Sequence, residues 1–135
     1  MPFPVDPKYI EKAESALGRR LPRAYRNQLI RTNGGAVQLD EDSVWWLYPI
    51  FDDSTTKRLR RTCNDILRET EEARAWPDFP SDVLAIAHDG SGNYLVLTPG
   101  DDPSSFADAV FMWDHEVGGL ERIARSLDDL EWLPG

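Results

Sequence analysis

The stretch from residue 83 to residue 115 restricts the fold of this chain more than any other part of the sequence. It holds three short runs rich in β-branched, aromatic and other apolar residues, at 83–88, 94–98 and 110–115, and only Asp-Gly-Ser-Gly-Asn separates the first two. Such runs are typical of strands, and a tight glycine-rich connection joins antiparallel neighbours. The stretch therefore predicts an antiparallel meander.

Two amphipathic helices are expected before these strands. Asp6 can cap the first helix, Pro7 suits its first turn and Gly18 suits its end. The second helix begins near Pro22 and ends at the Asn-Gly-Gly of residues 33–35, which tolerate positive φ. The apolar faces of the two helices hold Ile10, Ala13 and Leu17 in the first, and Leu21, Tyr25 and Leu29 in the second.

The remaining segments complete the expected order of elements. Residues 37–39 and 44–51 are predicted to form two strands around an acidic turn, and a longer helix follows from residue 54 or 55 and ends before Pro77. Residues 120–130 carry apolar side chains at helical spacing and predict a final helix. This order predicts an α+β fold in which helices pack on a mostly antiparallel sheet.

Length and composition fit one compact domain spanning residues 1–135. The chain is 41% hydrophobic and 29% charged, and a domain of this size buries about two-thirds of the surface that its unfolded chain exposes. Its single cysteine, Cys63, cannot form an internal disulfide, and no apolar run approaches the roughly 18 residues that span a bilayer. Because the N-terminus also lacks a signal-like pattern, we expect a cytoplasmic protein that does not enter membranes.

Charge is divided unevenly along the chain. The net charge is -9, but residues 1–75 have a balance of +1, whereas residues 76–135 hold 12 acidic residues against Arg122 and Arg125 and have a balance of -10. An acidic surface of this kind repels phosphate backbones and anionic headgroups. We therefore expect a cationic protein partner and no direct binding to nucleic acid.

The cluster most suggestive of chemistry is Asp114-His115-Glu116, where a histidine stands between two carboxylates. On a strand, His115 would point away from both carboxylates, which favours polar residues at a strand end over a catalytic or metal-binding role. His88 could meet His115 across the sheet, but the sequence offers no third ligand for such a pair.

Other motifs point away from enzymatic activity. The sequence contains no Gly-x-Ser-x-Gly elbow, and Cys63 is expected to be buried on the apolar face of a helix. The loop at 89–93 is expected to be a hairpin turn, because it joins two strands and lacks the lysine or spaced acids of phosphate and calcium loops. The adjacent acids at 52–53 and 101–102 are typical of solvated turns. We expect no catalytic residue, no metal and no cofactor.

Trp45 and Trp46 are adjacent on a predicted strand and so face opposite sides of the sheet. One of them can fill the core while the other is exposed or lies in a groove, where an exposed tryptophan beside acids would make an interface anchor. The alternative is that a helix covers the second face as well.

The ordered series of segments resembles the SUKH superfamily, which contains bacterial immunity proteins and a fungal regulator of cell-wall synthesis. The resemblance covers roughly residues 6–132. The residues that carry it are 10–17, the Leu-Pro-Arg-Ala-Tyr of 21–25 running to Leu29, the Asn-Gly-Gly of 33–35, the Trp-Leu-Tyr-Pro of 46–49, and the segments 84–93, 110–116 and 123–127.

The resemblance implies an α+β domain without catalytic residues that neutralises a toxin by direct binding. Together with the acidic second half of the chain, it indicates a protein that occupies the basic substrate site of a toxin, for example a nuclease. The alternative is a regulatory or scaffold domain without a toxin partner. The candidate partner contacts are Trp45, Trp46, Asp101, Asp102, Asp114 and Glu116.

Overall fold

The computed structural model describes residues 3–134. Its elements follow one another in the order α1 (Pro7–Leu17), α2 (Arg23–Arg31), β1 (Ala36–Asp40), β2 (Ser43–Leu47), α3 (Thr56–Arg61), α4 (Ile66–Ala73), β3 (Leu84–His88), β4 (Tyr94–Leu97), β5 (Val110–Trp113), β6 (Leu120–Ala124), the 3-10 helix η1 (Leu127–Asp129) and β7 (Glu131–Trp132). Helices that pack on an antiparallel sheet confirm the α+β prediction.

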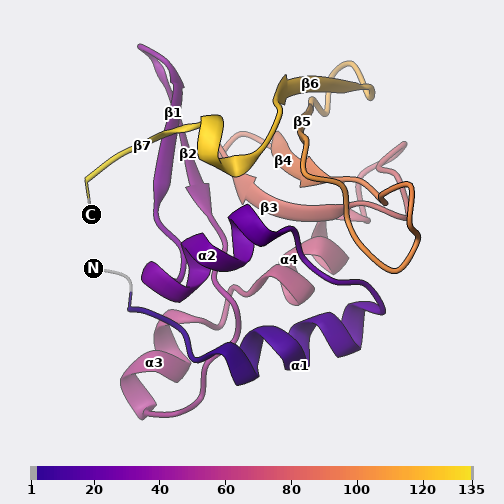
Figure 1. Ribbon diagram of the computed structural model, residues 1–135. Helices are drawn as coiled ribbons and strands as arrows, with labels where there is room; N and C mark the ends of the chain where they lie inside the picture. The colour runs from indigo at the N-terminus through magenta and orange to yellow at the C-terminus, as the bar shows by residue number, and fades with distance from the viewer. Residues whose placement is uncertain (1–2, 135) are drawn as a thin grey trace.

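All the strands belong to one antiparallel sheet with the order β6-β5-β4-β3-β2-β1-β7. Strands β1 to β5 are each paired with the next strand in the sequence, so that β6 forms one edge of the sheet, and β7 returns from the C-terminal segment to pair with β1. The predicted meander is confirmed, and Figure 1 shows the β1–β2 hairpin projecting beyond the rest of the sheet.

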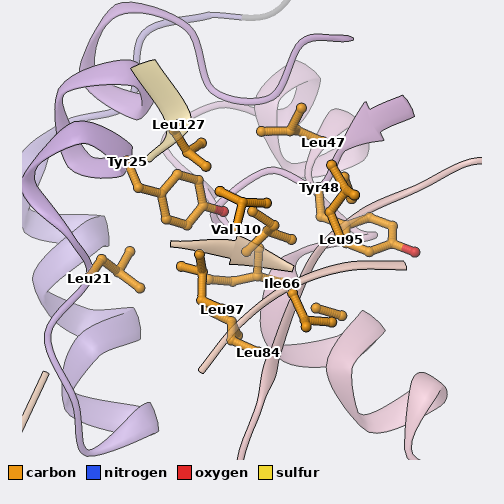
Figure 2. Close-up of a cluster of buried hydrophobic side chains, with 14 of the residues drawn as sticks. Leu21, Tyr25, Leu47, Tyr48, Ile66, Leu84, Leu95, Leu97, Val110 and Leu127 are labelled. Atoms are coloured by element: carbon orange, nitrogen blue, oxygen red, sulfur yellow. The ribbon is translucent and has the colours of Figure 1, made fainter. Parts of the chain in front are cut away.

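The first two helices form where the sequence predicts them. Asp6 caps α1 by accepting a hydrogen bond from the backbone N–H of Lys8 at 3.0 Å, and Gly18 ends the helix with a φ of 74°. Figure 1 shows α1 and α2 together on one side of the molecule. Their buried apolar residues belong to the same core as those of the strands, and Figure 2 shows Tyr25 of α2 beside Val110 of β5 and Leu127 of η1, all three of which are buried.

The predicted single helix after residue 54 is wrong, because the chain breaks it into α3 and α4. The Thr62 hydroxyl accepts a hydrogen bond from the backbone N–H of Asp52 at 2.9 Å, and Asp65 caps a new helix by accepting from the backbone N–H groups of Leu67 and Arg68. Cys63 lies in the break and is exposed, so the expectation that it is buried is also wrong.

Strand β2 is paired with only the second half of β3, and helix α4 lies beside the first half. The buried Thr70 hydroxyl accepts a hydrogen bond from the backbone N–H of Ala85 at 3.0 Å and lies 3.5 Å from the carbonyl oxygen of the same residue. Both residues are at most 2% exposed. A single side chain therefore satisfies two backbone groups that would otherwise be buried without a partner.

The predicted helix over residues 120–130 is wrong. Residues 120–124 instead form β6 beside β5, Ser126 caps the short helix η1, and residues 131–132 form β7 beside β1. Both strands complete hydrogen bonds along edges of the sheet that a helix would have left open, so tertiary pairing outweighs the helical spacing of the apolar residues.

Within residues 3–134, no helix is both long and apolar enough to cross a membrane.

Candidate functional site

A row of aromatic side chains crosses the sheet from β2 to β5. Trp46 is paired with His88, His88 with Tyr94, and Tyr94 with Trp113. Residues directly opposite one another on antiparallel strands share a face, so all four side chains lie on the same side of the sheet. The ring centroids are 5.7 Å apart for Trp46 and His88 and 6.1 Å apart for Tyr94 and Trp113, and Tyr48 stacks on His88 at 5.1 Å.

The two neighbouring tryptophans of β2 have opposite environments. Trp45 is 2% exposed, and its indole N–H donates to the Ser43 hydroxyl at 2.7 Å, whereas Trp46 is 47% exposed. The predicted alternation across the sheet is confirmed. Trp45 therefore lies in the core, and Trp46 is the member of the pair that a partner can reach.

The far end of the aromatic row is covered by the chain that follows α4. Phe79 packs edge-on against Trp113 at 5.0 Å, and Trp76 lies 6.2 Å from Trp113 and 4.9 Å from His115. Trp113 is fully buried as a result, while Trp76 keeps 37% exposure. The row is thus buried at its β5 end and open to solvent at Trp46.

The strand order places the acidic turns at two ends of the sheet. The turns after β1, β3 and β5 lie at one end because successive strands are antiparallel neighbours, and the loop between β4 and β5 lies at the other. We call residues 40–42, 89–93 and 114–119 the acidic end, since they hold six carboxylates and no lysine or arginine.

The structure separates the predicted partner contacts. Asp114 and Glu116 belong to the acidic end, whereas Asp101 and Asp102 are in the loop at the opposite end of the sheet. That loop is held to the end of α1, where the Arg19 guanidinium donates to the carbonyl of Pro103 at 3.0 Å. A single small interface centred on the acidic end would not include Asp101 and Asp102.

Asp114-His115-Glu116 is a turn rather than the end of a strand, which corrects the reasoning from strand alternation. β5 ends at Trp113, and the Asp114 carboxylate accepts a hydrogen bond from the backbone N–H of Glu116 at 2.8 Å. The ring Nδ1 of His115 lies 2.9 Å from Oδ1 of Asn93 instead of contacting a carboxylate. Among the described residues, no group of three or more His, Cys, Asp or Glu side chains has a metal-binding arrangement.

The turn at 89–93 is organised by its own aspartate and supports His115. Asp89 accepts hydrogen bonds from the backbone and hydroxyl of Ser91 and from the side chain of Asn93. Burial acts to raise the pKa of Asp89, but these hydrogen bonds outweigh it and hold the pKa below its usual range. Gly92 has a φ of 97°, and a Cβ there would lie 3.0 Å from the Trp76 ring. The glycine-rich turn is therefore a structural support for the acidic end.

Sequence reasoning missed a groove beside Trp46. A cavity of about 440 Å³ lies between β1 and β2, helix α3 and the C-terminal segment. We call it the basic groove, because two arginines of α3 line it. Its walls include Phe3, Gly34, Trp46, Arg58, Arg61 and Leu133. The signal in the sequence is the basic run at 57–61, but only the fold brings that run against residues near both ends of the chain.

The floor of the basic groove is fixed by a buried asparagine. The Asn33 side chain donates to the carbonyl of Ile50 at 2.8 Å and accepts from the backbone N–H of Ile50 at 2.7 Å. The backbone N–H of Asn33 donates to the carbonyl of Phe3 at 2.7 Å, and Leu133 donates from its backbone N–H to the carbonyl of Ala36 at 2.9 Å. These bonds hold four separate segments around one cavity.

The comparison with protein families covers almost the whole chain. The model of the SMI1 / KNR4 family (SUKH-1) matches residues 4–131. The chain belongs to the SMI1 / KNR4 family. No curated protein matches it significantly.

Family membership confirms the resemblance, and the structure gives physical roles to its motifs. In this SMI1 / KNR4 domain, the Asn-Gly-Gly of 33–35 supplies the bonds of Asn33 and two glycines with φ of 119° and 105°. A side chain at either glycine would be strained. The motif therefore shapes the chain between α2 and β1, where the floor of the basic groove is formed.

Proposed function

We propose that this SMI1 / KNR4 domain is a non-enzymatic binding protein that neutralises a basic toxin domain by direct contact. The observation that carries the proposal is the exposure of Trp46 at the open end of the aromatic row, on the strand that neighbours β3 and its acidic turn. A half-exposed tryptophan supplies an apolar anchor, and the acidic turn after the neighbouring strand β3 supplies part of a charged rim.

The charge distribution supports a basic partner. The acidic end carries Asp114, Glu116 and four further carboxylates with no lysine or arginine among them. A nuclease must present a positive surface to hold phosphates, so such a toxin would be attracted to this end and its substrate site covered. Charge would mainly speed the encounter, while burial of Trp46 would supply much of the affinity.

The surroundings of His115 support a binding role over an enzymatic one. Its ring is held against Trp76, and its Nδ1 is within hydrogen-bond distance of Asn93, which in turn donates to Asp89 at 3.0 Å. These contacts orient the histidine as part of the turn. His88 stacks on the ring of Tyr48 and lies tilted against the ring of Trp46, and both contacts are typical of packing.

The proposal is tested with the toxin-like product of a neighbouring gene. The purified toxin domain is titrated with the wild type, with Trp46→Ala, with the acidic-end double variant Asp114→Asn/Glu116→Gln, and with the matched control Asp101→Asn/Asp102→Asn from the opposite end. Trp46→Ala is expected to weaken binding by at least about thirtyfold, as for an interface anchor. The acidic-end variant should slow association and reduce its salt dependence, and the control should do neither.

Absence of binding to any adjacent toxin-like product overturns the proposal and leaves the regulatory or scaffold alternative. Equal losses in the two double variants would show that net charge, rather than the acidic end, governs recognition.

A further inference from the structure

Three apolar side chains are exposed around the turn between β5 and β6. Val117 in that turn is 80% exposed, Leu120 at the start of β6 is 38% exposed, and Trp76 after α4 is 37% exposed. They are half of the large hydrophobic side chains that are exposed within residues 3–134. Single apolar residues are normal on a surface, but neighbouring ones mark an interaction site. We call these three residues the apolar patch.

Contacts with the core and between loops bring the patch together. Leu120 is paired with Trp113, so these two side chains share one face of the sheet, and Trp76 lies 6.2 Å from the same Trp113 ring. A Cβ at Gly118 would lie 3.6 Å from the Cβ of Asp78, so the β5–β6 turn touches the segment that follows α4. Figure 1 shows this turn on the opposite side of the molecule from the first and last residues that the structure describes.

The turn that carries Val117 is held by hydrogen bonds. The backbone N–H groups of Val117 and Gly118 donate to the carbonyl of Asp114 at 3.2 and 2.7 Å. The backbone N–H of Glu116 donates to the Asp114 carboxylate at 2.8 Å. A surface that is already ordered loses less conformational entropy when a partner binds. The turn therefore presents Val117 in a form that is ready for contact.

The rim of the apolar patch is mostly negative. The segments 74–82 and 114–122 hold five carboxylates against Arg74 and Arg122. Arg74 is already in an ion pair on α4. Within the part of the chain that the structure describes, Asp78, Asp114 and Glu116 form no ion pair. An occupant therefore gains most by placing lysine or arginine beside its apolar group.

The same charges disfavour other occupants. Nucleic acids and anionic membranes would be repelled by the rim, and a second copy of the chain related by a two-fold axis would bring equal carboxylates together. A basic protein segment complements both the apolar side chains and the carboxylates.

We propose that the apolar patch binds a basic segment of a partner protein. One large apolar side chain of the segment packs among Trp76, Val117 and Leu120, and flanking lysine or arginine side chains meet Asp78 and Glu116. Charge selects the segment, and burial of the apolar side chain adds affinity. The inference rests on the proposed function in taking the acidic end as a contact surface, and it adds an apolar anchor at that end.

The test titrates the isotope-labelled full chain with a synthetic probe, acetyl-Lys-Arg-Leu-Arg-Lys-amide, and follows binding by NMR. The indole N–H signal of Trp76 and the backbone signals of residues 114–120 are expected to shift. One comparison peptide replaces the leucine by serine, and another replaces the four cations by glutamates. The probe should bind about fivefold more tightly than the serine peptide, and at least about tenfold more tightly than the glutamate peptide at low salt.

Variants of the apolar patch locate the contact. Val117→Ser is expected to weaken binding of the probe about fivefold, whereas Val117→Ile should preserve it. The matched control Ile30→Ser removes an apolar side chain that is 40% exposed on α2, and it should change binding less than about twofold. Both positions are exposed, so the variants should stay folded, which urea unfolding checks.

A second pair of variants tests the rim. Asp78→Asn/Glu116→Gln should weaken binding about threefold or more at low salt and have little effect near 1 M salt. The matched control Asp101→Asn/Glu11→Gln changes the net charge equally at exposed positions outside the rim, and it should have a smaller effect.

The inference is overturned if the probe shifts no signal at millimolar concentration, if the leucine and serine peptides bind equally, or if either variant loses no more than its control. A different occupant also overturns it: either self-association of the chain or binding to phosphatidylcholine vesicles that Val117→Ser abolishes. A failed toxin titration with an intact peptide response would reject the proposed function alone. Toxin binding that Val117→Ser leaves unchanged would reject this inference alone.

Discussion

Replacing Asn33 by aspartate isolates one hydrogen bond that supports the basic groove. Asn33 is 7% exposed, and its side-chain N–H donates to the carbonyl of Ile50 at 2.8 Å while its Oδ1 accepts from the backbone N–H of the same residue at 2.7 Å. Asn33→Asp keeps the size of the side chain and the second bond. It turns the first bond into a contact between a carboxylate oxygen and a carbonyl oxygen.

The size of the effect follows from losing a donor and burying a charge. A hydrogen bond lost in a buried site costs about 1 kcal/mol, and the unpaired charge adds about 2 kcal/mol, so Asn33→Asp should lower the free energy of unfolding by about 3 kcal/mol near pH 7. A domain of ordinary stability remains folded after such a loss. Burial and repulsion from the Ile50 carbonyl should raise the pKa of the introduced carboxyl above its value in the unfolded chain.

The sign of the pH dependence follows from that raised pKa. Below the unfolded pKa the introduced acid is protonated in both states, and its O–H can donate to the Ile50 carbonyl, so the penalty should fall to about 1 kcal/mol near pH 3. As the pH rises through the folded pKa, this advantage is lost and the penalty grows. Urea unfolding of the variant and the wild type, followed by tryptophan fluorescence at both pH values, measures the difference.

The control is Asn27→Asp, which makes the same chemical change on the exposed face of α2 and should cost less than about 0.5 kcal/mol at either pH. The reasoning is refuted if Asn33→Asp is as stable as the wild type near pH 7, or if its penalty increases on acidification.

Three further substitutions test single contacts by urea unfolding. Gly92→Ala should cost about 2 kcal/mol or more, because its backbone has a φ of 97° and the new Cβ would lie 3.0 Å from the Trp76 ring. Thr70→Val should cost about 2 kcal/mol, because it leaves the buried N–H of Ala85 without a partner. Asp52→Asn should cost about 1 kcal/mol near pH 7. Burial alone would raise the pKa of Asp52, but hydrogen bonds and a nearby arginine hold it below its usual range, so the difference should vanish as the pH falls through the folded pKa.

Each of these changes has a matched control. Gly90→Ala places a Cβ at a φ of 85° with no atom within 4 Å, so it separates backbone strain from the clash at Gly92. Thr56→Val and Asp53→Asn repeat the other two changes at exposed positions and should cost less than about 0.5 kcal/mol. Equal effects within any pair would contradict the contact assigned to the buried member.

Local rules predicted those parts of the fold that local interactions control. The cap at Asp6, the left-handed stop at Gly18 and the hairpin at 89–93 each depend on residues within a few positions of one another. Residues 120–130 behave differently, because their apolar spacing fits a helix as well as it fits the strand β6 and the short helix η1 that they form. Pairing with the free edges of β5 and β1 favours strands over a continuous helix, and those edges exist only once the sheet has formed.

The candidate site also combines features that local sequence predicts with features that depend on distant segments. Alternation along β2 predicted that Trp45 and Trp46 face opposite sides, but which of them is covered depends on helices and loops distant in the sequence. The basic groove could not be predicted, since it requires Phe3, the turn after α2, helix α3 and Leu133 to meet. The basic run at 57–61 gave the charge of the groove without its location.

The sequence of the edge strand β6 disfavours edge-to-edge pairing of two copies of the sheet. β6 is paired with β5 on one side only, and its five residues are Leu-Glu-Arg-Ile-Ala. A second copy that extended the sheet about a two-fold axis normal to it, with all five residues paired, would set Arg122 directly opposite its own symmetry mate. Like charges directly opposite each other destabilise an antiparallel pair. One arginine at the centre of the edge thus acts against a fully paired edge-to-edge dimer through β6.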